Sequence, residues 1–191
     1  MNIRDITNSC FHGYEKFDFF KHNVKLFFGD LNFRINMDYE EVIEKVNVMT
    51  PDHYENGFST YEKSEETKLI TDSYTNEVIS ELVSKDQLIS AMSQYHWLYG
   101  FREMPIEFLP TYKYMPGSNI YDDSAKKRVP SYWDRILWHE VQSQEEETGY
   151  VEPILYKRIE STFSDHKPIA ALFKIGLPKN YGKRVIYKFD E

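Results

Sequence analysis

The sequence lacks the features that mark secreted, membrane-spanning and nucleic-acid-binding proteins. Among 191 residues only Cys10 is a cysteine, so no intramolecular disulfide can form, which fits a reducing compartment. No basic stretch joined to an apolar stretch opens the chain, and we therefore expect no signal peptide. The longest apolar runs, such as Ile169–Phe173, are far shorter than the ~20 residues of a spanning helix. These absences predict a soluble, cytoplasmic protein.

An excess of positive charge is also missing. The formal net charge is −8, whereas broad nucleic-acid binding leaves a basic footprint, so we expect no nucleic-acid partner. The charge is nevertheless uneven. Asp38–Glu44 and Glu145–Glu147 are acidic, but Thr111–Trp138 holds five Lys or Arg against three Asp. This basic segment predicts an anionic ligand bound locally.

The chain contains no internal repeats and no glycine-rich phosphate loop, and its length suits one domain. Asp38 and Glu41 form a capping box that predicts a helix, and Glu77–Trp97 predicts two short helices or one bent near Ser84–Asp86. Asn2–Phe20 gives a weak helical signal. Short apolar runs predict strands at Asn23–Phe28, Ile106–Leu109, Arg135–His139, Ile154–Ile159, Ile169–Ile175 and Arg184–Phe189. Helices early and strands late indicate part of a layered α/β domain.

One internal stretch has a different character. Thr50–Asn76 is polar, rich in Ser, Thr, Glu and Tyr, and has no sustained periodicity. Such a composition predicts a long surface loop or insertion that is partly disordered.

Phe28–Arg34, which reads F-G-D-L-N-F-R, places Asp30 and Asn32 at the end of an apolar run. Alternate residues of a strand share a face, so we expect both side chains to point the same way. A carboxylate can orient and deprotonate an attacking water, and the nearby amide can fix that water or a phosphoryl group. The alternative is an ordinary strand-to-turn junction, where Asp and Asn are common.

Ser164–Pro168, which reads S-D-H-K-P, places Asp165 and His166 just before another apolar run. A histidine held by a carboxylate keeps one tautomer and a raised pKa, so it can donate to a phosphoryl oxygen. Asp134, at the start of the strand near 135, is a candidate for that carboxylate. Asp165 is a candidate metal ligand, because hard cations such as Mg²⁺ prefer oxygen.

The basic segment offers separate phosphate contacts through Lys113, Lys126 and Arg128. The alternative is a solvated basic loop in which Arg135 forms a salt bridge with an acid, an arrangement worth little energetically.

Six segments, in their order along the chain, resemble the catalytic domain of the inositol polyphosphate 5-phosphatases. That family belongs to the endonuclease/exonuclease/phosphatase superfamily. Two of them resemble the family's longest signatures. Phe27–Arg34 differs from the first by Phe27 in place of Trp, and Arg128–Leu137 differs from the second by Trp133 in place of Cys or Thr. The other four are Asp86–Leu88, Gly100–Glu103, Pro110–Tyr114 and Ser164–Pro168.

The resemblance implies a fold and a reaction. The fold would be the C-terminal portion of a four-layer α/β/β/α sandwich, and the reaction the Mg²⁺-dependent hydrolysis of a 5-phosphate monoester on phosphoinositides or soluble inositol polyphosphates. Transient contact with a membrane surface would accompany a lipid substrate.

The same resemblance implies roles for individual residues. Asp30 would orient or deprotonate the attacking water, with Asn32 assisting at the phosphoryl group. His166 would contact the scissile phosphate, held by Asp134, and Asp165 would lie near the metal. The neighbouring 4-phosphate would be bound by Tyr112, Lys113, Lys126 and Arg128. The bulk of Trp133 calls for rearranged packing around Asp134.

The family's earlier segments, including a Q-E dipeptide whose Glu is its main magnesium ligand, do not occur before Phe27. We therefore expect residues 1–191 to be a partial catalytic domain that lacks its N-terminal portion. Two further functions stay open. One is a catalytically dead remnant that binds anionic headgroups or a partner protein, and the other is a nuclease of the same superfamily.

Overall fold

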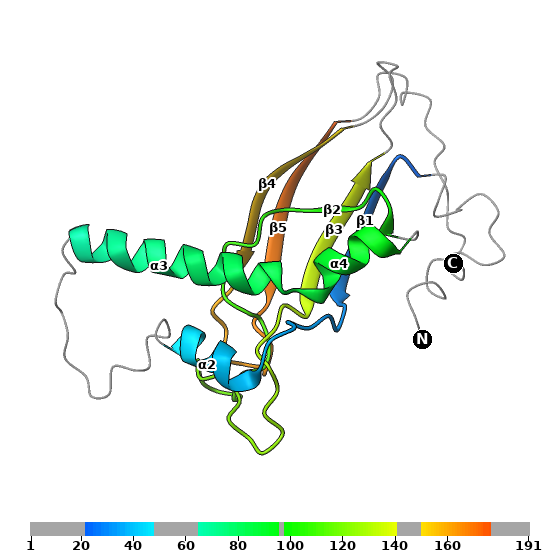
Figure 1. The fold of residues 1–191 in the computed structure, drawn as a ribbon. Coiled ribbons are helices and arrows are strands. Elements are labelled where there is room, and N and C mark those ends of the chain that lie inside the picture. Colours follow the sequence, from blue (N-terminus) through cyan, green and yellow to red (C-terminus); the bar gives the residue numbers. More distant parts are fainter. Residues whose placement is uncertain (1–21, 48–64, 96–97, 141–149, 177–191) are drawn as a thin grey trace.

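The computed structural model describes residues 22–47, 65–95, 98–140 and 150–176, which form strands and helices in mixed order (Figure 1). The strands are β1 (Val24–Asp30), β2 (Arg102–Glu103), β3 (Asp134–Glu140), β4 (Tyr150–Arg158) and β5 (Ile169–Gly176). The helices are α2 (Tyr39–Asn47), α3 (Glu65–Ser84) and α4 (Gln87–Gln94). None of the helices in these ranges has the length and apolarity needed to cross a bilayer.

The strands form two antiparallel sheets. One has the order β1-β3-β2 and the other pairs β4 with β5. The β4–β5 register shifts between Pro153 and Leu155, because proline has no N–H to give to the ladder. In the first sheet the last residue of β1, Asp30, lies opposite the first residue of β3, Asp134. This register brings two carboxylates to one edge of the sheet.

Strand β3 is covered on both faces. On one face Leu137 packs with Leu88 and Ala91 of α4 and with Leu98 and Phe101. On the other face Trp138 meets Phe173 of β5, with ring centroids 5.5 Å apart. Since successive residues of a strand point to opposite faces, Asp134 lies on the β5 side and Arg135 on the α4 side.

Helices α2 and α3 pack together through Val42 and Val46 of the first and Val78, Ile79 and Leu82 of the second. Chain direction changes after Ser84, and Asp86 then caps α4 by accepting a hydrogen bond from the Leu88 N–H at 3.0 Å. The predicted helix after Asp38 and the break near Ser84–Asp86 are both confirmed.

Two predictions from the sequence are wrong. Ile106–Leu109 is not a strand. Ile106 and Leu109 are buried in an irregular segment, and the flanking Pro105 and Pro110 have no N–H for a ladder. Residues 65–76 belong to α3 and not to a loop. A helix anchored at its C-terminal end by Val78, Ile79 and Leu82 extends through polar residues at low cost, because propagation is easier than nucleation.

Other predictions lie partly or wholly outside the described residues. These are the weak helical signal at 2–20, the strand at 184–189 and residues 50–64 of the polar stretch. Strands β1, β3, β4 and β5 agree with the predicted runs to within a few residues. An α/β class with two sheets is what the sequence indicated.

Candidate active site

The centre of the site is an aspartate–histidine pair. Asp134 lies at the start of β3. Its Oδ2 forms a hydrogen bond with Nδ1 of His166, at 2.9 Å. The Thr111 hydroxyl donates to the same Oδ2 at 2.8 Å. Two contacts therefore hold this carboxylate and fix the orientation of the imidazole. The predicted Asp134–His166 pair is present.

Main-chain bonds hold the two ends of this pair in place. Tyr112 forms isolated antiparallel bridges with both Ser131 and His166, so one residue connects the segment before β3 to the segment before β5. The Lys167 N–H donates to the Thr111 carbonyl at 2.8 Å, one residue further on. Segments distant in sequence thus meet at a backbone-defined geometry.

The surroundings of His166 favour its charged form. The hydrogen bond to Asp134 raises the pKa of His166 above its usual value, and the negative charges of Asp134, Asp165 and Asp30 add to this; partial burial opposes it. A raised pKa means that the ring is more often protonated, with Nε2 as a donor beyond the pair. Asp30 lies opposite Asp134 in the β1–β3 pair, so the third predicted acid is at the same edge of the sheet.

Asp30 and Asn32 do not share a strand face as predicted. The strand ends at Asp30, and Asn32 has a left-handed φ of 57° in the turn that follows. The Asn32 N–H donates to Asp30 Oδ1 at 2.9 Å, and the Leu31 N–H donates to the Trp133 carbonyl at 2.7 Å. Asn tolerates this conformation well, so the turn orients the exposed Asp30 carboxylate through a backbone donor.

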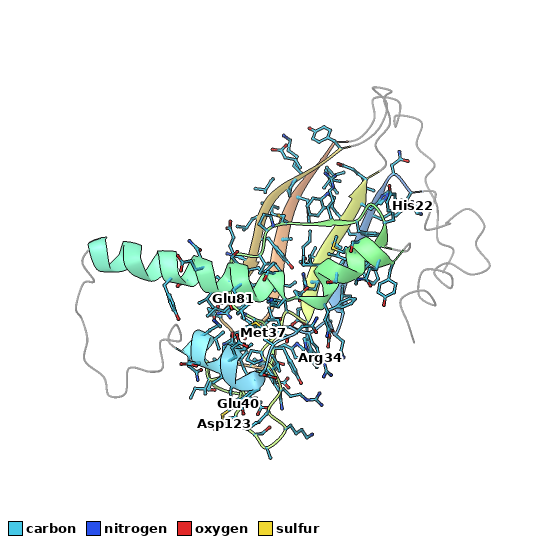
Figure 2. The ribbon with its side chains drawn as sticks, viewed as in Figure 1. His22, Arg34, Met37, Glu40, Glu81 and Asp123 are labelled. Carbon is cyan, nitrogen blue, oxygen red and sulfur yellow. The ribbon has the colours of Figure 1, made fainter. Side chains whose placement is uncertain are left out.

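Aromatic rings pack against the Asp134–His166 pair, in an arrangement that the sequence does not predict. Tyr112 stacks on Trp133 with centroids 3.7 Å apart and lies 4.5 Å from the His166 ring. Trp133 also meets His166 edge-on at 6.1 Å, and the exposed Arg34 guanidinium lies 5.6 Å over the indole. The bulk of Trp133 is accommodated by this stacking and Asp134 keeps its place. Figure 2 shows Arg34 at the lower end of the strands, where this cluster lies.

The predicted phosphate-binding cations lie on a loop beside the pair, and they differ in their partners. Lys113 contacts Asp122 at 3.3 Å. Lys126 is exposed and Arg128 half-buried, and within the described part of the chain neither has a charged or hydrogen-bonding partner. Lys127, which was not predicted to bind phosphate, pairs with Glu40 of α2. Figure 2 shows Glu40 and Asp123 together at this end of the molecule.

The described residues do not make a complete metal site. No group of three or more His, Cys, Asp or Glu side chains is placed among them to hold an ion. Asp165 is half-buried and its Oδ1 accepts from Ser164 Oγ at 3.3 Å, while its carbonyl accepts from the Tyr114 N–H at 2.9 Å. An ion near Asp165 or Asp30 would need further ligands, because no third side chain of these types is grouped with them in the described residues.

Comparison with known proteins decides the family. The family described as "Endonuclease/Exonuclease/phosphatase family 2" matches residues 1–172. The chain belongs to this family. Relatives include synaptojanin of Caenorhabditis elegans, 31% identical over 170 residues, and phosphatidylinositol 4,5-bisphosphate 5-phosphatase A of Rattus norvegicus, 34% identical over 161 residues.

These matches cover most of this chain and a small part of each relative. The match takes 89% of this chain but 12% of synaptojanin, and 80% of this chain but 13% of the rat phosphatase. Inositol polyphosphate 5-phosphatase K of Mus musculus, 31% identical, is matched over 91% of this chain and 34% of its own length. The chain thus spans at most about a third of the length of these relatives.

Solved structures agree on the fold. The inositol polyphosphate 5-phosphatase domain of spsynaptojanin, solved with inositol (1,4)-bisphosphate and a calcium ion, has a TM-score of 0.57 and 30% identity, over 84% of this chain and 38% of that one. Cimex nitrophorin, at 24% identity and a TM-score of 0.59 over 85% of this chain and 46% of that one, shows the shared fold alone. The predicted fold class, the α/β sandwich of this family, is confirmed.

Proposed function

We propose that the protein hydrolyses the 5-phosphate monoester of phosphoinositides or soluble inositol polyphosphates. The observation that carries the proposal is the Asp134–His166 pair at 2.9 Å, beside Asp30 at the same sheet edge. Relatives named as 5-phosphatases support it.

Asp30 is proposed to orient and deprotonate the attacking water. Its carboxylate is exposed at the end of β1, and the Asn32 N–H fixes one of its oxygens while leaving the other open. The Asn32 side chain follows in the turn and is proposed to assist at the phosphoryl group.

His166 is proposed to donate a hydrogen bond to an oxygen of the scissile phosphate. Asp134 holds Nδ1, and the raised pKa favours the imidazolium, which can neutralise negative charge on the phosphoryl oxygens. Asp134 acts through His166, so it is a positioning residue.

The 4-phosphate is proposed to lie against Tyr112, Lys113, Lys126 and Arg128. The cations without partners in the described part of the chain, Lys126 and Arg128, are available to a phosphate, whereas Lys113 must share its charge with Asp122. Selectivity for a substrate with adjacent phosphates follows from these contacts.

A divalent ion, which we propose to be Mg²⁺, would complete the site, with Asp165 among the nearby oxygen donors. The calcium ion in the related synaptojanin domain supports a hard divalent cation. Because the described residues hold no group of three such ligands, water, substrate oxygens or further side chains would have to complete its coordination.

We also propose transient contact with a membrane surface and a cytoplasmic location. Relatives named for phosphatidylinositol 4,5-bisphosphate support the first. The single cysteine supports the second.

The reaction is tested by incubating the chain with phosphatidylinositol 4,5-bisphosphate or soluble inositol 1,4,5-trisphosphate, with Mg²⁺ and after chelation. We expect phosphate release that needs Mg²⁺ and leaves the 4-phosphate on the product. Loss of the 4-phosphate, or equal release from the His166→Ala variant, would contradict the proposal.

The incomplete metal site favours a second candidate, a catalytically inactive domain that binds anionic headgroups through the same cations. It predicts saturable binding of inositol 1,4-bisphosphate by the chain without any phosphate release in Mg²⁺. Calorimetric titration beside the release assay distinguishes the two functions.

A further inference from the structure

A cation without an acidic partner lies beside the candidate active site. Arg34 is exposed, follows Asn32 by two residues and lies at the lower end of the strands (Figure 2). Its guanidinium lies 5.6 Å from the centroid of the Trp133 indole. Within the described part of the chain, no carboxylate or other hydrogen-bond acceptor contacts this guanidinium. Its five N–H donors are therefore available to an anion.

Arg34 differs from the other cations that lie over aromatic rings in the described residues, because each of those also contacts a glutamate. They are Arg102 over Trp138 with Glu140, Lys127 over Tyr39 with Glu40, and Arg158 and Lys167 over Tyr114 with Glu160. Those contacts are ion pairs of the fold, whereas the charge of Arg34 is left for a ligand.

The backbone of Arg34 is fixed by the first residue of α4. The Arg34 N–H donates to Gln87 Oε1 at 3.1 Å, and the Arg34 carbonyl accepts from the Gln87 N–H at 2.8 Å. The next residue, Ile35, is buried, and its N–H donates to Ser131 Oγ at 3.1 Å. The exposed side chain thus extends from an ordered stretch of chain, which lowers the entropy cost of binding a ligand through it.

The ring under the guanidinium is also held in place. Trp133 is 8% exposed, its carbonyl accepts from the Leu31 N–H at 2.7 Å, and its indole stacks on Tyr112 with centroids 3.7 Å apart. The same indole meets the His166 ring edge-on at 6.1 Å. The guanidinium, the indole and the proposed phosphate donor His166 therefore belong to one aromatic cluster.

We propose that Arg34 binds a phosphate group on the inositol ring of the ligand, and that Trp133 positions its guanidinium for this contact. A planar guanidinium can give two parallel N–H bonds to a phosphate from its edge while its face stays on an indole. The inference rests on the proposed function, because the ligand is the proposed substrate. It adds a contact from outside the basic segment that contains Lys113, Lys126 and Arg128.

The contact is tested by calorimetric titration with inositol 1,4,5-trisphosphate and with dioctanoyl-phosphatidylinositol 4,5-bisphosphate, both after chelation of divalent ions so that neither is hydrolysed. Arg34→Met should bind each ligand about tenfold more weakly, because a bidentate, charge-assisted contact is lost. Arg34→Lys should recover part of the loss, since it keeps the charge without the fork. Arg102→Met is the matched control and should bind as the unmodified chain does, because Arg102 also lies over an indole but pairs with Glu140.

The role of Trp133 is tested by combining substitutions. Trp133→Phe keeps a ring under the guanidinium and should retain most of the affinity, whereas Trp133→Leu should lose it. Arg34→Met should then weaken binding less in the Trp133→Leu background than in the unmodified chain, because the two side chains act together. Equal losses in both backgrounds would overturn the positioning role of Trp133.

Phosphate release separates this inference from the proposed reaction. If binding depends on Arg34 but no substrate releases phosphate in Mg²⁺, the contact stands and the reaction is wrong. If phosphate is released and Arg34→Met changes neither the affinity nor the KM, the reaction stands and the contact is wrong.

Three further results would overturn the contact. The first is an unmodified chain that binds neither ligand. The second is a loss in Arg34→Met that is confined to the lipid, since a ring phosphate is common to both ligands. The third is a lower urea midpoint for Arg34→Met with unaltered affinity, which would make Arg34 a structural residue.

Discussion

Asp134 and Arg135 are adjacent in β3, yet they take part in two very different ionic clusters on opposite faces of one sheet. Asp134 is half-buried and holds His166, whose ring is open to a ligand. Arg135 is fully buried and contacts Asp86 at 2.7 Å and Glu103 at 2.6 Å. Charged side chains therefore form the proposed active site on the solvent-accessible face of the sheet and a buried structural cluster on the other face.

The buried cluster joins four elements. Asp86 caps α4, Glu103 ends β2, Arg135 belongs to β3, and the Tyr156 hydroxyl of β4 donates to Glu103 Oε1 at 2.9 Å. The fork of the guanidinium satisfies both oxygens of Glu103. It also fixes the start of β3, and therefore the position of Asp134.

The largest effect is expected from disrupting the Asp134–His166 pair, and this effect is on activity. His166→Ala removes the proposed donor to the phosphate, so we expect phosphate release to fall by about 10²–10⁴-fold. Urea unfolding should change little, because the ring is partly exposed. An unfolding midpoint that falls together with activity would instead make His166 a structural residue.

Disrupting the buried cluster of Arg135, Asp86 and Glu103 should instead act mainly on stability. Arg135→Met leaves Asp86 and Glu103 buried without their cation, and we expect the free energy of unfolding to fall by about 3–5 kcal/mol in urea denaturation. Arg102→Met, on the neighbouring strand and paired with the partly exposed Glu140, is the matched control and should cost far less. Equal losses in the two variants would refute the distinction.

The proposed phosphate contacts should give a smaller, ligand-specific effect. Arg128→Ala is expected to weaken binding of inositol 1,4-bisphosphate about tenfold, through loss of a charge-assisted hydrogen bond. Calorimetric titration measures it. Lys127→Ala is the control and should keep its affinity, because Lys127 pairs with Glu40. If Arg128→Ala also keeps its affinity, Arg128 is not part of the site.

The electrostatic coupling of the pair predicts a shift along the pH axis. Since Asp134 raises the pKa of His166, the stability gained from the pair is fully present below about pH 6.5 and is lost as the pH rises through the raised value. In Asp134→Asn the pKa of His166 should fall, measured by NMR titration of the ring, and the high-pH limb of activity should move the same way. Asp165→Asn should lower the pKa of His166 less, because the charge of Asp165 raises that pKa less than Asp134 does.

The smallest effect is expected at the molecular surface. Lys127→Gln breaks the exposed pair with Glu40 of α2, and we expect no measurable change in the urea midpoint, because water screens both groups. A clear loss of stability there would show that exposure does not separate weak ion pairs from strong ones in this chain.

The sequence predicts the pairing of Asp134 with His166 better than it predicts the surroundings of that pair. The Asp134–His166 pair was predicted because each residue stands just before an apolar run, and strand ends can meet. For Asn32 the strand alternation predicts the wrong orientation, because β1 ends at Asp30 and Asn32 lies in the turn that follows. The sequence alone allows a solvated salt bridge for Arg135. The structure buries this side chain, because its partners Glu103 and Asp86 are distant in sequence and meet it only in the fold.

Helix α3 shows another limit. Its first half has no apolar periodicity, and only tertiary packing of its last turns explains why the helix extends there. The roles of all the candidate site residues stay predictions, as does the loop predicted at residues 50–64.

The stacking of Trp133 on Tyr112, with His166 at its edge, gives the protein an intrinsic optical reporter. An imidazolium quenches indole emission by accepting an electron, whereas the neutral ring quenches weakly. Emission from Trp133 should therefore brighten as His166 loses its proton. Because Trp97 and Trp138 also emit, the part of the pH-dependent emission that is lost in His166→Ala would follow the state of this histidine without a label.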